Sequence, residues 1–266
     1  MARIISPHNN TTQYQASPIT VPLVLHRVVK TSSNVFEDID LKTFNSIVSH
    51  IAKGWVTFED IACQRTGLSR NWLLTFDDGH SSDYEIVFPT LQDAGIKAVF
   101  YLITGRVGFP GYLSWEQVRE MRRHGMEFGS HGLNHSKMTS LNKVQALNEL
   151  TRSRLDIEDH LGEAVTTFAF PYGDYNTDLI RLTASAGYAA CCISDHGTVK
   201  LSAQLIPRNS INSAMRWPEI LRTLEPSPFV CFRWTIEDWL KKRVKRLLSD
   251  GAYQFLRSLV STGPSQ

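Results

Sequence analysis

Two adjacent carboxylates, Asp77 and Asp78, lie where the apolar run WLLTF ends and a glycine follows. Neighbouring carboxylates repel each other unless a cation, a hydrogen-bond donor or a shared proton relieves the repulsion. Such a pair at a strand end can serve acid–base or metal chemistry. Because Asp-Gly pairs are also common in turns, a solvated turn is the alternative that this motif alone leaves open.

Two histidines with metal-ligand spacing, His131 and His135, follow another apolar run in the segment SHGLNH. Two imidazoles four residues apart can bind one metal ion, and an aspartate from a neighbouring strand end would complete a set of two histidines and one carboxylate. Three protein ligands leave a position for water, which is the pattern of a hydrolytic metal site. A single histidine is more often an ordinary surface or core residue, but this spacing favours a metal site.

A third strand end carries the segment FAFPYG, in which Pro171 and Gly173 predict a tight turn. A backbone N–H near Tyr172 would then be able to point into a cleft and stabilise a developing oxyanion. A plain strand exit with a buried tyrosine is the alternative interpretation of this segment.

These three motifs depend on strands that bring their ends together. Apolar runs predict strands at 21–29, 72–79, 97–104, 126–132, 166–173, 188–195 and 204–211. Helices are expected from the capping residue Ser114 to Gly125, from Ser140 to Gly162, and over 177–186. Alternating strands and helices predict a parallel α/β architecture, and polar strand ends favour a barrel with its site at the C-terminal ends of the strands.

The composition is that of an ordinary globular protein. The chain has 266 residues, 42% of them hydrophobic, and a formal net charge of +2, so nothing points to nucleic acid as a partner. We expect an N-terminal tail (1–20), a main domain (21–225) and a connector with C-terminal helices (226–266). Four cysteines, including the neighbours Cys191 and Cys192, predict buried thiols rather than a disulfide framework.

We expect neither a secretory signal nor a membrane span, because residues 1–20 lack an apolar core and no run reaches about 18 apolar residues. We therefore expect a cytoplasmic protein, with the inner face of the membrane as the alternative location.

A basic C-terminal helix is expected after a connector at 226–234. Its apolar stripe consists of Trp239, Leu240, Val244, Leu247 and Leu248. Beside the stripe lie five basic residues, Lys241, Lys242, Arg243, Lys245 and Arg246. One interpretation is a helix that packs its stripe on the barrel and exposes a solvated basic face. The other is peripheral contact with anionic lipid.

Taken in order, TFDDG (75–79), SHGLNH (130–135) and FAFPYGDYN (168–176) resemble the NodB-like polysaccharide deacetylases of carbohydrate esterase family four, over residues 20 to about 212. LVLHRV (23–28) and LSWEQVREMRRHGMEFGSHGLNH (113–135) support the resemblance, which is greatest to the branch that acts on poly-N-acetylglucosamine. The resemblance implies a distorted (β/α) barrel with a C-terminal helical extension. It also implies a hydrolase that releases acetate from the N-acetyl groups of a glycan and leaves free amines.

The resemblance also implies roles for individual residues. Asp77 would be the catalytic base, and Tyr172 would supply the oxyanion N–H. The ligands of a divalent metal, most simply Zn²⁺, would be Asp78, His131 and His135. The substrate cleft would be lined by His26, Pro171 and Tyr172.

Two departures from the family pattern affect the acid–base residues. Many members tether the base with an arginine two residues before the proline of the third motif, where this chain has Ala169, so Arg208 is our candidate for the tether. The usual late Leu-x-His is not evident, which makes His196 the candidate general acid. Alternative functions are an O-acetyl esterase, a deacylase of small N-acyl compounds, and a glycan-binding protein that has lost catalysis.

Overall fold

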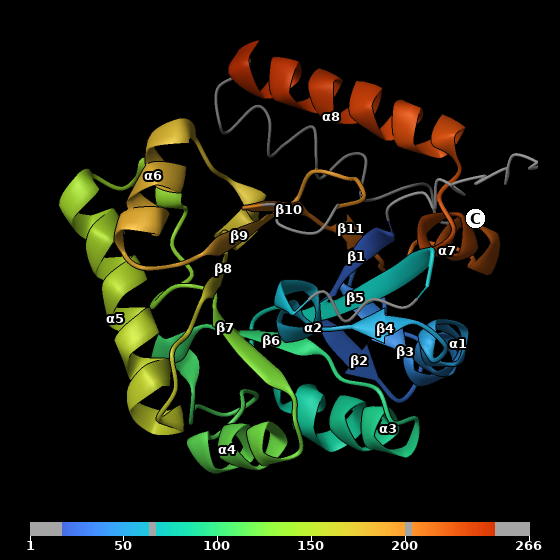
Figure 1. Cartoon of the computed structure of the whole chain (residues 1–266), viewed down its shortest axis with the longest axis horizontal. Coiled ribbons are helices and arrows are strands. Elements are labelled where there is room, and N and C mark those ends of the chain that lie inside the picture. Colours follow the sequence, from blue (N-terminus) through green and yellow to red (C-terminus); the bar gives the residue numbers. More distant parts are fainter. Residues whose placement is uncertain (1–17, 64–67, 200–203, 248–266) are drawn as a thin grey trace, which may run out of the picture.

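The computed structural model, which describes residues 18–63, 68–199 and 204–247, is built around a parallel sheet that curls into a nearly closed barrel (Figure 1). Its strand order is β10-β9-β8-β7-β6-β5-β1-β11, and all of these strand pairs are parallel. The strands are β1 (Ile19–Leu25), β5 (Arg70–Phe76), β6 (Val99–Leu102), β7 (Glu127–Ser130), β8 (Thr167–Ala169), β9 (Ala190–Ile193), β10 (Leu205–Pro207) and β11 (Asn209–Ser210). A short β4 (Trp55–Val56) also pairs with β5. The predicted α/β barrel is confirmed.

The barrel closes at Arg208. Residues 205–207 pair with β9, whereas residues 209–210 pair with β1 on the other side. The strand predicted over 204–211 is therefore two strands, because the chain changes partners at this residue.

The strand predicted over 21–29 also breaks, at His26. After β1, the chain forms β2 (Arg27–Val29), which pairs with β3 (Asp38–Asp40) in a separate small sheet. The Arg27 guanidinium donates two hydrogen bonds of 2.8 Å to the Asp38 carboxylate, which fixes this branch. His26 is left at the rim of the barrel, where β1 ends.

Side chains alternate between the inside and the outside of the barrel, as the two-residue repeat of a strand requires. Leu73 packs in an inner cluster, whereas Leu74 belongs to the core between sheet and helices. Cys192 and Cys191 divide in the same way, so the prediction of buried thiols is confirmed for this pair. It is wrong for Cys63, which is exposed in the loop after a short helix.

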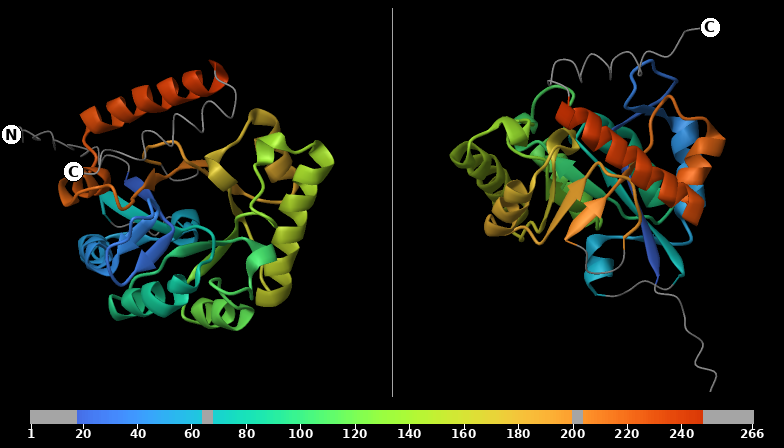
Figure 2. Two further views of the ribbon diagram at one scale, coloured as in Figure 1. Left: turned by 180° about the vertical axis from the view of Figure 1, so that it is seen from behind. Right: turned by 90° about the horizontal axis from the view of Figure 1, so that it is seen from above.

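Helices surround the barrel (Figures 1 and 2). They are α1 (Leu41–Ile51), α2 (Phe58–Ala62), α3 (Phe88–Asp93), α4 (Trp115–Arg123), α5 (Lys143–Leu161), α6 (Thr177–Ser185), α7 (Trp217–Leu224) and α8 (Pro228–Leu247). The predicted capping box of α4 is present, with Ser114 and Gln117 bonded to each other's backbone. Helix α5 ends at Gly162 as predicted, but it begins after Asn142 rather than Ser140, because Asn142 and Gln145 form its capping box.

The connector predicted at 226–234 is wrong for most of its length, since α8 begins at Pro228. The Ser227 hydroxyl accepts a hydrogen bond from the Val230 N–H at 3.3 Å, and proline is favoured in the first helical turn. Figure 2 shows α8 lying across the side of the barrel formed by β9 and β10. None of the described helices has an apolar stretch long enough to cross a lipid bilayer.

Part of the predicted domain division lies outside the described residues, namely 1–17 of the N-terminal tail and 248–266, which include Leu248 of the apolar stripe. The boundary at residue 225 stays a prediction.

Candidate active site

One rim of the barrel collects the residues that the motifs singled out. The aspartates 77 and 78 follow β5, His131 follows β7, and Tyr172 lies in a 3-10 turn, Pro171–Gly173, after β8. Arg208 follows β10 at the same end. Because all these strands are parallel, their C-terminal ends meet at one edge, which is where barrel sites form.

Asp78, His131 and His135 form a group with metal-binding geometry. Asp78 Oδ1 lies 3.5 Å from His131 Nε2 and 3.4 Å from His135 Nε2, and the three potential ligand atoms lie within 4.8 Å of one another. Asp78 Oδ1 is buried and has no hydrogen-bond partner. His131 Nδ1 is bonded to the Ala169 carbonyl at 2.8 Å, which leaves its Nε2 lone pair facing the group. An orphaned carboxylate oxygen beside two such nitrogens fits a divalent cation.

Backbone strain is concentrated at this site. Among the described residues, three that are not glycine have positive φ angles, and they are Asp78 (77°), His135 (58°) and Tyr172 (59°). Left-handed backbone is uncommon for such residues and costs of order 1–3 kcal/mol each. All three strained residues lie at the same rim of the barrel. This clustering indicates a functional site, because the surrounding fold must stabilise each strained conformation.

Gly173 shows how tightly the third motif is built. Its φ is 61°, and a Cβ atom there would lie 1.9 Å from the Ser194 hydroxyl oxygen. Only glycine fits, so the turn around Tyr172 is set by the next strand end. The Tyr172 ring is 60% exposed and lies 4.6 Å from the His135 ring. The sequence alternative of a buried tyrosine is therefore wrong.

The loop that carries both histidines is folded around a buried carboxylate, Glu149 of α5. Glu149 Oε2 accepts hydrogen bonds from the Leu133 and Asn134 N–H groups, both at 2.9 Å. Its Oε1 accepts from the Asn134 side-chain amide at 2.7 Å and from the Ser136 hydroxyl at 3.1 Å. Glu149 thus fixes the path of the chain between His131 and His135.

Asp77 is held apart from the metal-binding group by a buried ion pair. Both Asp77 oxygens accept hydrogen bonds of 2.6 Å from the two terminal nitrogens of Arg208, and both side chains are nearly inaccessible to solvent. Arg208 also donates to the Thr75 hydroxyl at 3.1 Å and lies over the Tyr101 ring. Asp77 Oδ2 remains 3.9 Å from His131 Nε2.

The electrostatics keep both aspartates ionised. Burial would raise the pKa of Asp77, but Arg208, with His131 and His26 nearby, holds it below its usual range. Burial is likewise outweighed for Asp78, whose pKa is held well below its usual range by a hydrogen bond from His80 and by the neighbouring imidazoles. Burial, with the charge of His131, lowers the pKa of His135 to about 4. An ionised carboxylate and a neutral imidazole are the forms that bind metals.

His80 is a site residue that sequence reasoning missed, although it stands two positions after Asp78. His80 Nε2 lies 3.5 Å from Asp78 Oδ2, and its ring stacks on Tyr112 with the centroids 5.3 Å apart. Tyr112 in turn accepts a hydrogen bond from Arg106 at 2.6 Å. These residues orient the Asp78 oxygen that faces away from the two histidines.

The structure places His26, the predicted cleft residue, and His196, the predicted general acid, in different surroundings. His26 is near the aspartates, because its imidazole contributes to the low pKa of both Asp77 and Asp78. His196 is instead bonded to α8, with Nδ1 at 2.9 Å from Asp238 Oδ1 and its ring stacked on Trp234. In the described part of the chain, no contact joins His196 to the aspartates or to the metal-binding group.

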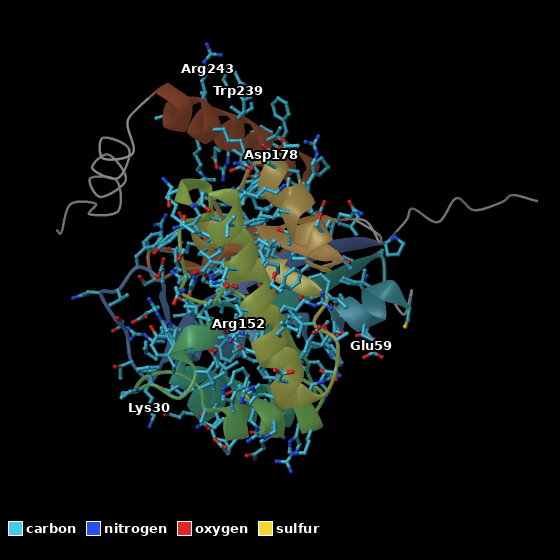
Figure 3. All side chains as sticks on the ribbon, turned by 90° about the vertical axis from the view of Figure 1, so that its left-hand side faces the viewer. Lys30, Glu59, Arg152, Asp178, Trp239 and Arg243 are labelled. Carbon is cyan, nitrogen blue, oxygen red and sulfur yellow. The ribbon has the colours of Figure 1, made fainter. Side chains whose placement is uncertain are left out.

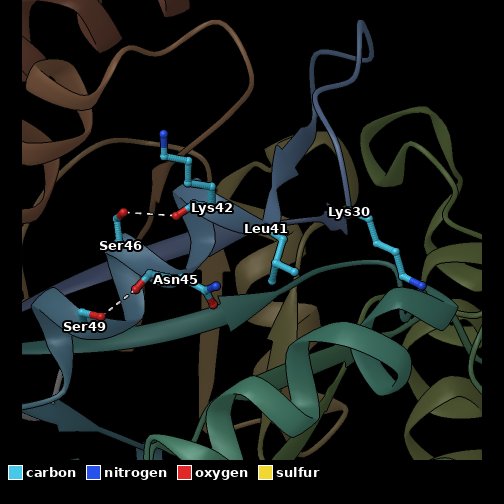
Figure 4. A pocket seen from close by; sticks show the side chains of 6 residues that line it. All are labelled: Lys30, Leu41, Lys42, Asn45, Ser46 and Ser49. Carbon is cyan, nitrogen blue, oxygen red and sulfur yellow. Dashed lines mark hydrogen bonds between the residues drawn. The ribbon is translucent and has the colours of Figure 1, made fainter.

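A pocket elsewhere on the surface holds none of these residues (Figure 4). It lies between the end of β2 and helix α1, and its lining consists of Lys30, Leu41, Lys42, Asn45, Ser46 and Ser49. The candidate site at the rim is therefore separate from this hollow.

Sequence comparisons match the chain to known proteins. The family model described as Polysaccharide deacetylase matches residues 64–191. YxkH of Bacillus subtilis (strain 168) is 30% identical over 116 residues, covering 44% of this chain and 42% of the relative. The poly-beta-1,6-N-acetyl-D-glucosamine N-deacetylase of Staphylococcus aureus (strain MSSA476) is 27% identical over 155 residues, 52% of this chain and 53% of the relative. The chain spans about half the length of these curated relatives.

Solved structures share the fold. The Streptococcus pyogenes deacetylase PplD, in complex with acetate, matches with a TM-score of 0.71 and 21% identity, covering 79% of this chain and 100% of that one. IcaB from Ammonifex degensii matches with a TM-score of 0.67 and 24% identity, covering 78% and 97%. At such identities the likeness establishes the barrel fold.

Replacing Glu149 by glutamine should loosen the histidine loop, because an amide cannot accept all of the hydrogen bonds that the carboxylate receives. We expect the affinity for Zn²⁺, measured by competition with a chromophoric chelator, to fall about 10- to 100-fold. Glu158→Gln on the same helix is the matched control, since Glu158 bonds Arg154 and the Val165 N–H instead. Equal metal affinity in Glu149→Gln and the native chain would contradict this role.

Proposed function

We propose, from the premise that the chain belongs to the polysaccharide deacetylase family, that it is a metal-dependent hydrolase of N-acetyl groups on a glycan containing N-acetylglucosamine. The observation that carries the proposal is the placement of a tethered, ionised Asp77 beside the Asp78–His131–His135 group, in which Asp78 Oδ1 is buried without a hydrogen-bond partner. One carboxylate is thus available as a base while its neighbour is available as a ligand. The S. aureus relative, which is named for poly-N-acetylglucosamine, suggests the substrate class.

Asp78, His131 and His135 would hold a divalent cation, and we propose Zn²⁺ because two imidazoles and one carboxylate suit it. When bound, such an ion polarises a carbonyl and lowers the pKa of a water molecule. The residues around it keep the ligands in place, since Ala169 and Glu149 orient the histidines and His80 orients Asp78.

Asp77 would remove the proton from the attacking water as general base. Arg208 aims both of its terminal N–H groups at this carboxylate and prevents it from turning into the metal-binding group. A base that stays ionised is ready at neutral pH, and its pKa below the usual range provides this. Arg208 would in this way replace the arginine that many relatives have where this chain has Ala169.

Tyr172 and Pro171 would form the wall of the substrate cleft beside His135. The exposed ring of Tyr172 offers a flat apolar surface for a sugar, and its backbone N–H would stabilise the oxyanion of the tetrahedral intermediate. The positive φ of Tyr172 is the local distortion that supports this proposal.

We assign the general acid to His26 in preference to His196. An acid must reach the leaving nitrogen near the catalytic base, and His26 is the histidine outside the metal-binding group whose imidazole acts on both aspartates. The interactions of His196 with Asp238 and Trp234 support a structural role in holding α8 instead.

Acetate release from N-acetylglucosamine oligomers, with and without a chelator, tests the proposed function. We expect chelation to abolish release reversibly, and Asp77→Asn to bind metal but lose about 10²- to 10⁴-fold in turnover, because it lacks the base. Asp178→Asn, an exposed aspartate on α6, is the control and should behave like the native chain.

The same assay separates the alternative functions. Release from acetylated xylan but not from the oligomers would indicate an O-acetyl esterase, and release only from small N-acyl compounds would indicate another deacylase. Metal binding without release from any substrate would indicate a glycan-binding protein. Undiminished release by the chelated protein would contradict the proposed metal dependence.

The leaving group distinguishes the two candidate acids. A general acid matters for an amide, whose amine must be protonated, but little for an activated acetyl ester. We expect His26→Asn to depress amide hydrolysis at least about tenfold more than ester hydrolysis, and His196→Asn to leave that ratio unchanged. If the ratio moves in His196→Asn and not in His26→Asn, His196 is the acid.

A further inference from the structure

Helix α8 carries an apolar face that no described part of the molecule covers. We define the outer face of α8 by six residues with exposed fractions between 39% and 73%, namely Phe229, Phe232, Ile236, Trp239, Leu240 and Val244. Their spacing of three and four residues places them along one side of the helix. Figure 3 shows Trp239 and Arg243 projecting from α8 away from the barrel.

The opposite side of α8 packs on the barrel, and it does so largely through polar contacts. Asp238 accepts a hydrogen bond from the His196 N–H at 2.7 Å, and Lys242 donates to Asp195 at 2.5 Å. Trp234 is the large apolar residue buried on this side. A soluble surface helix normally buries its apolar stripe and exposes its polar residues. Helix α8 does the reverse, so the prediction that its stripe packs on the barrel is wrong for Trp239, Leu240 and Val244.

The basic residues of α8 indicate which kind of partner the outer face would bind. Residues 228–247 contain six Lys or Arg residues and two acidic residues, and five of the basic ones lie between 241 and 246. Lys241 and Arg243 are exposed; Lys241 Nζ lies 3.5 Å from Asp238 Oδ1, and the Arg243 guanidinium lies 5.3 Å from the centre of the Trp239 ring. Aromatic residues beside arginine and lysine are typical of helices that lie in the headgroup region of an anionic membrane.

We infer that α8 is a peripheral membrane-binding helix whose outer face enters the interface of a bilayer rich in anionic lipid. A second copy of the chain is a poorer occupant, because pairing two outer faces would bring together two helices that each carry six basic and two acidic residues. Anionic headgroups supply that counter-charge, and acyl chains cover the aromatic residues. The rim with Asp77 and Asp78 would then work beside the membrane surface.

Vesicle sedimentation with the full chain tests this inference. We expect the protein to sediment with phosphatidylcholine vesicles that contain phosphatidylglycerol, to bind less as salt is added, and to bind pure phosphatidylcholine weakly. The double variant Phe232→Ser/Trp239→Ser should lower the partition coefficient at least about tenfold, because it removes two buried aromatic groups at the interface. Lys241→Gln/Arg243→Gln should weaken the preference for phosphatidylglycerol, because it removes two of the six basic side chains.

Val144→Ser/Leu155→Ser is the matched control, since both residues are exposed and apolar but lie on α5. This control should bind vesicles like the native chain, and all variants should keep the native circular dichroism spectrum. Acetate release from soluble oligomers should be unchanged in the α8 variants, which separates this inference from the proposed function.

The inference is overturned if the native chain does not sediment with phosphatidylglycerol vesicles, or if Phe232→Ser/Trp239→Ser binds them as well as the native chain does. It is also overturned if light scattering shows a dimer that the same variant abolishes, because the outer face would then be a subunit interface.

Discussion

The buried ion pair between Asp77 and Arg208 is the interaction on which the site depends. Asp77 stands next to another carboxylate, and two ionised groups in that position need separate counter-charges. Arg208 supplies one, and the Asp78–His131–His135 group has the geometry to bind the other. Breaking a buried pair by removing one partner typically costs about 3–5 kcal/mol, so the pair also ties the site to the stability of the barrel.

Arg208 lies at the point where the two ends of the sheet are joined by the chain. Arg208 stands between β10, which pairs with β9, and β11, which pairs with β1, so both strand pairings position its backbone. Inside the barrel, its side chain lies over Tyr101 and bonds Thr75, and both are inward-facing positions of neighbouring strands. Asp77 is thereby positioned by long-range contacts, whereas the histidine loop is positioned by Glu149 from one adjacent helix.

The sequence predicted those parts of the site that lie in local motifs. A few neighbouring residues are enough to identify each motif, namely the two aspartates, the two histidines and the FPYG turn. Because the predicted strands are parallel, the meeting of these motifs at one rim was also predictable. Arg208 could be suggested because the base lacked its usual tether and a late strand ended in arginine. Helix α4 was predictable from its capping box, and the split strands were not, since each break depends on which partner the chain pairs with.

Other features required the folded structure. Glu149 looks like a polar residue of a surface helix, yet it is buried, whereas Val144 on the same helix is 78% exposed. The burial of Glu149 depends on the histidine loop, whose N–H groups it accepts hydrogen bonds from, and not on the local sequence of α5. His196 was suggested by its position after a strand, but its imidazole binds α8, which the sequence does not place. Ser227 and Pro228 are a typical start of a helix, but the prediction assigned both residues to a connector.

The pH dependence of acetate release by metal-loaded protein tests the role of the Asp77–Arg208 pair most directly. Arg208 holds the pKa of Asp77 down, so its removal raises that pKa and protonates the base at higher pH. Arg208→Met should therefore shift the acidic limb of kcat/KM upward, Arg208→Lys should shift it less, and the control Arg122→Met, which loses a pair with Glu163, should leave it in place. An acidic limb that is unchanged in both folded Arg208 variants would contradict the assignment of Asp77 as a base set by Arg208.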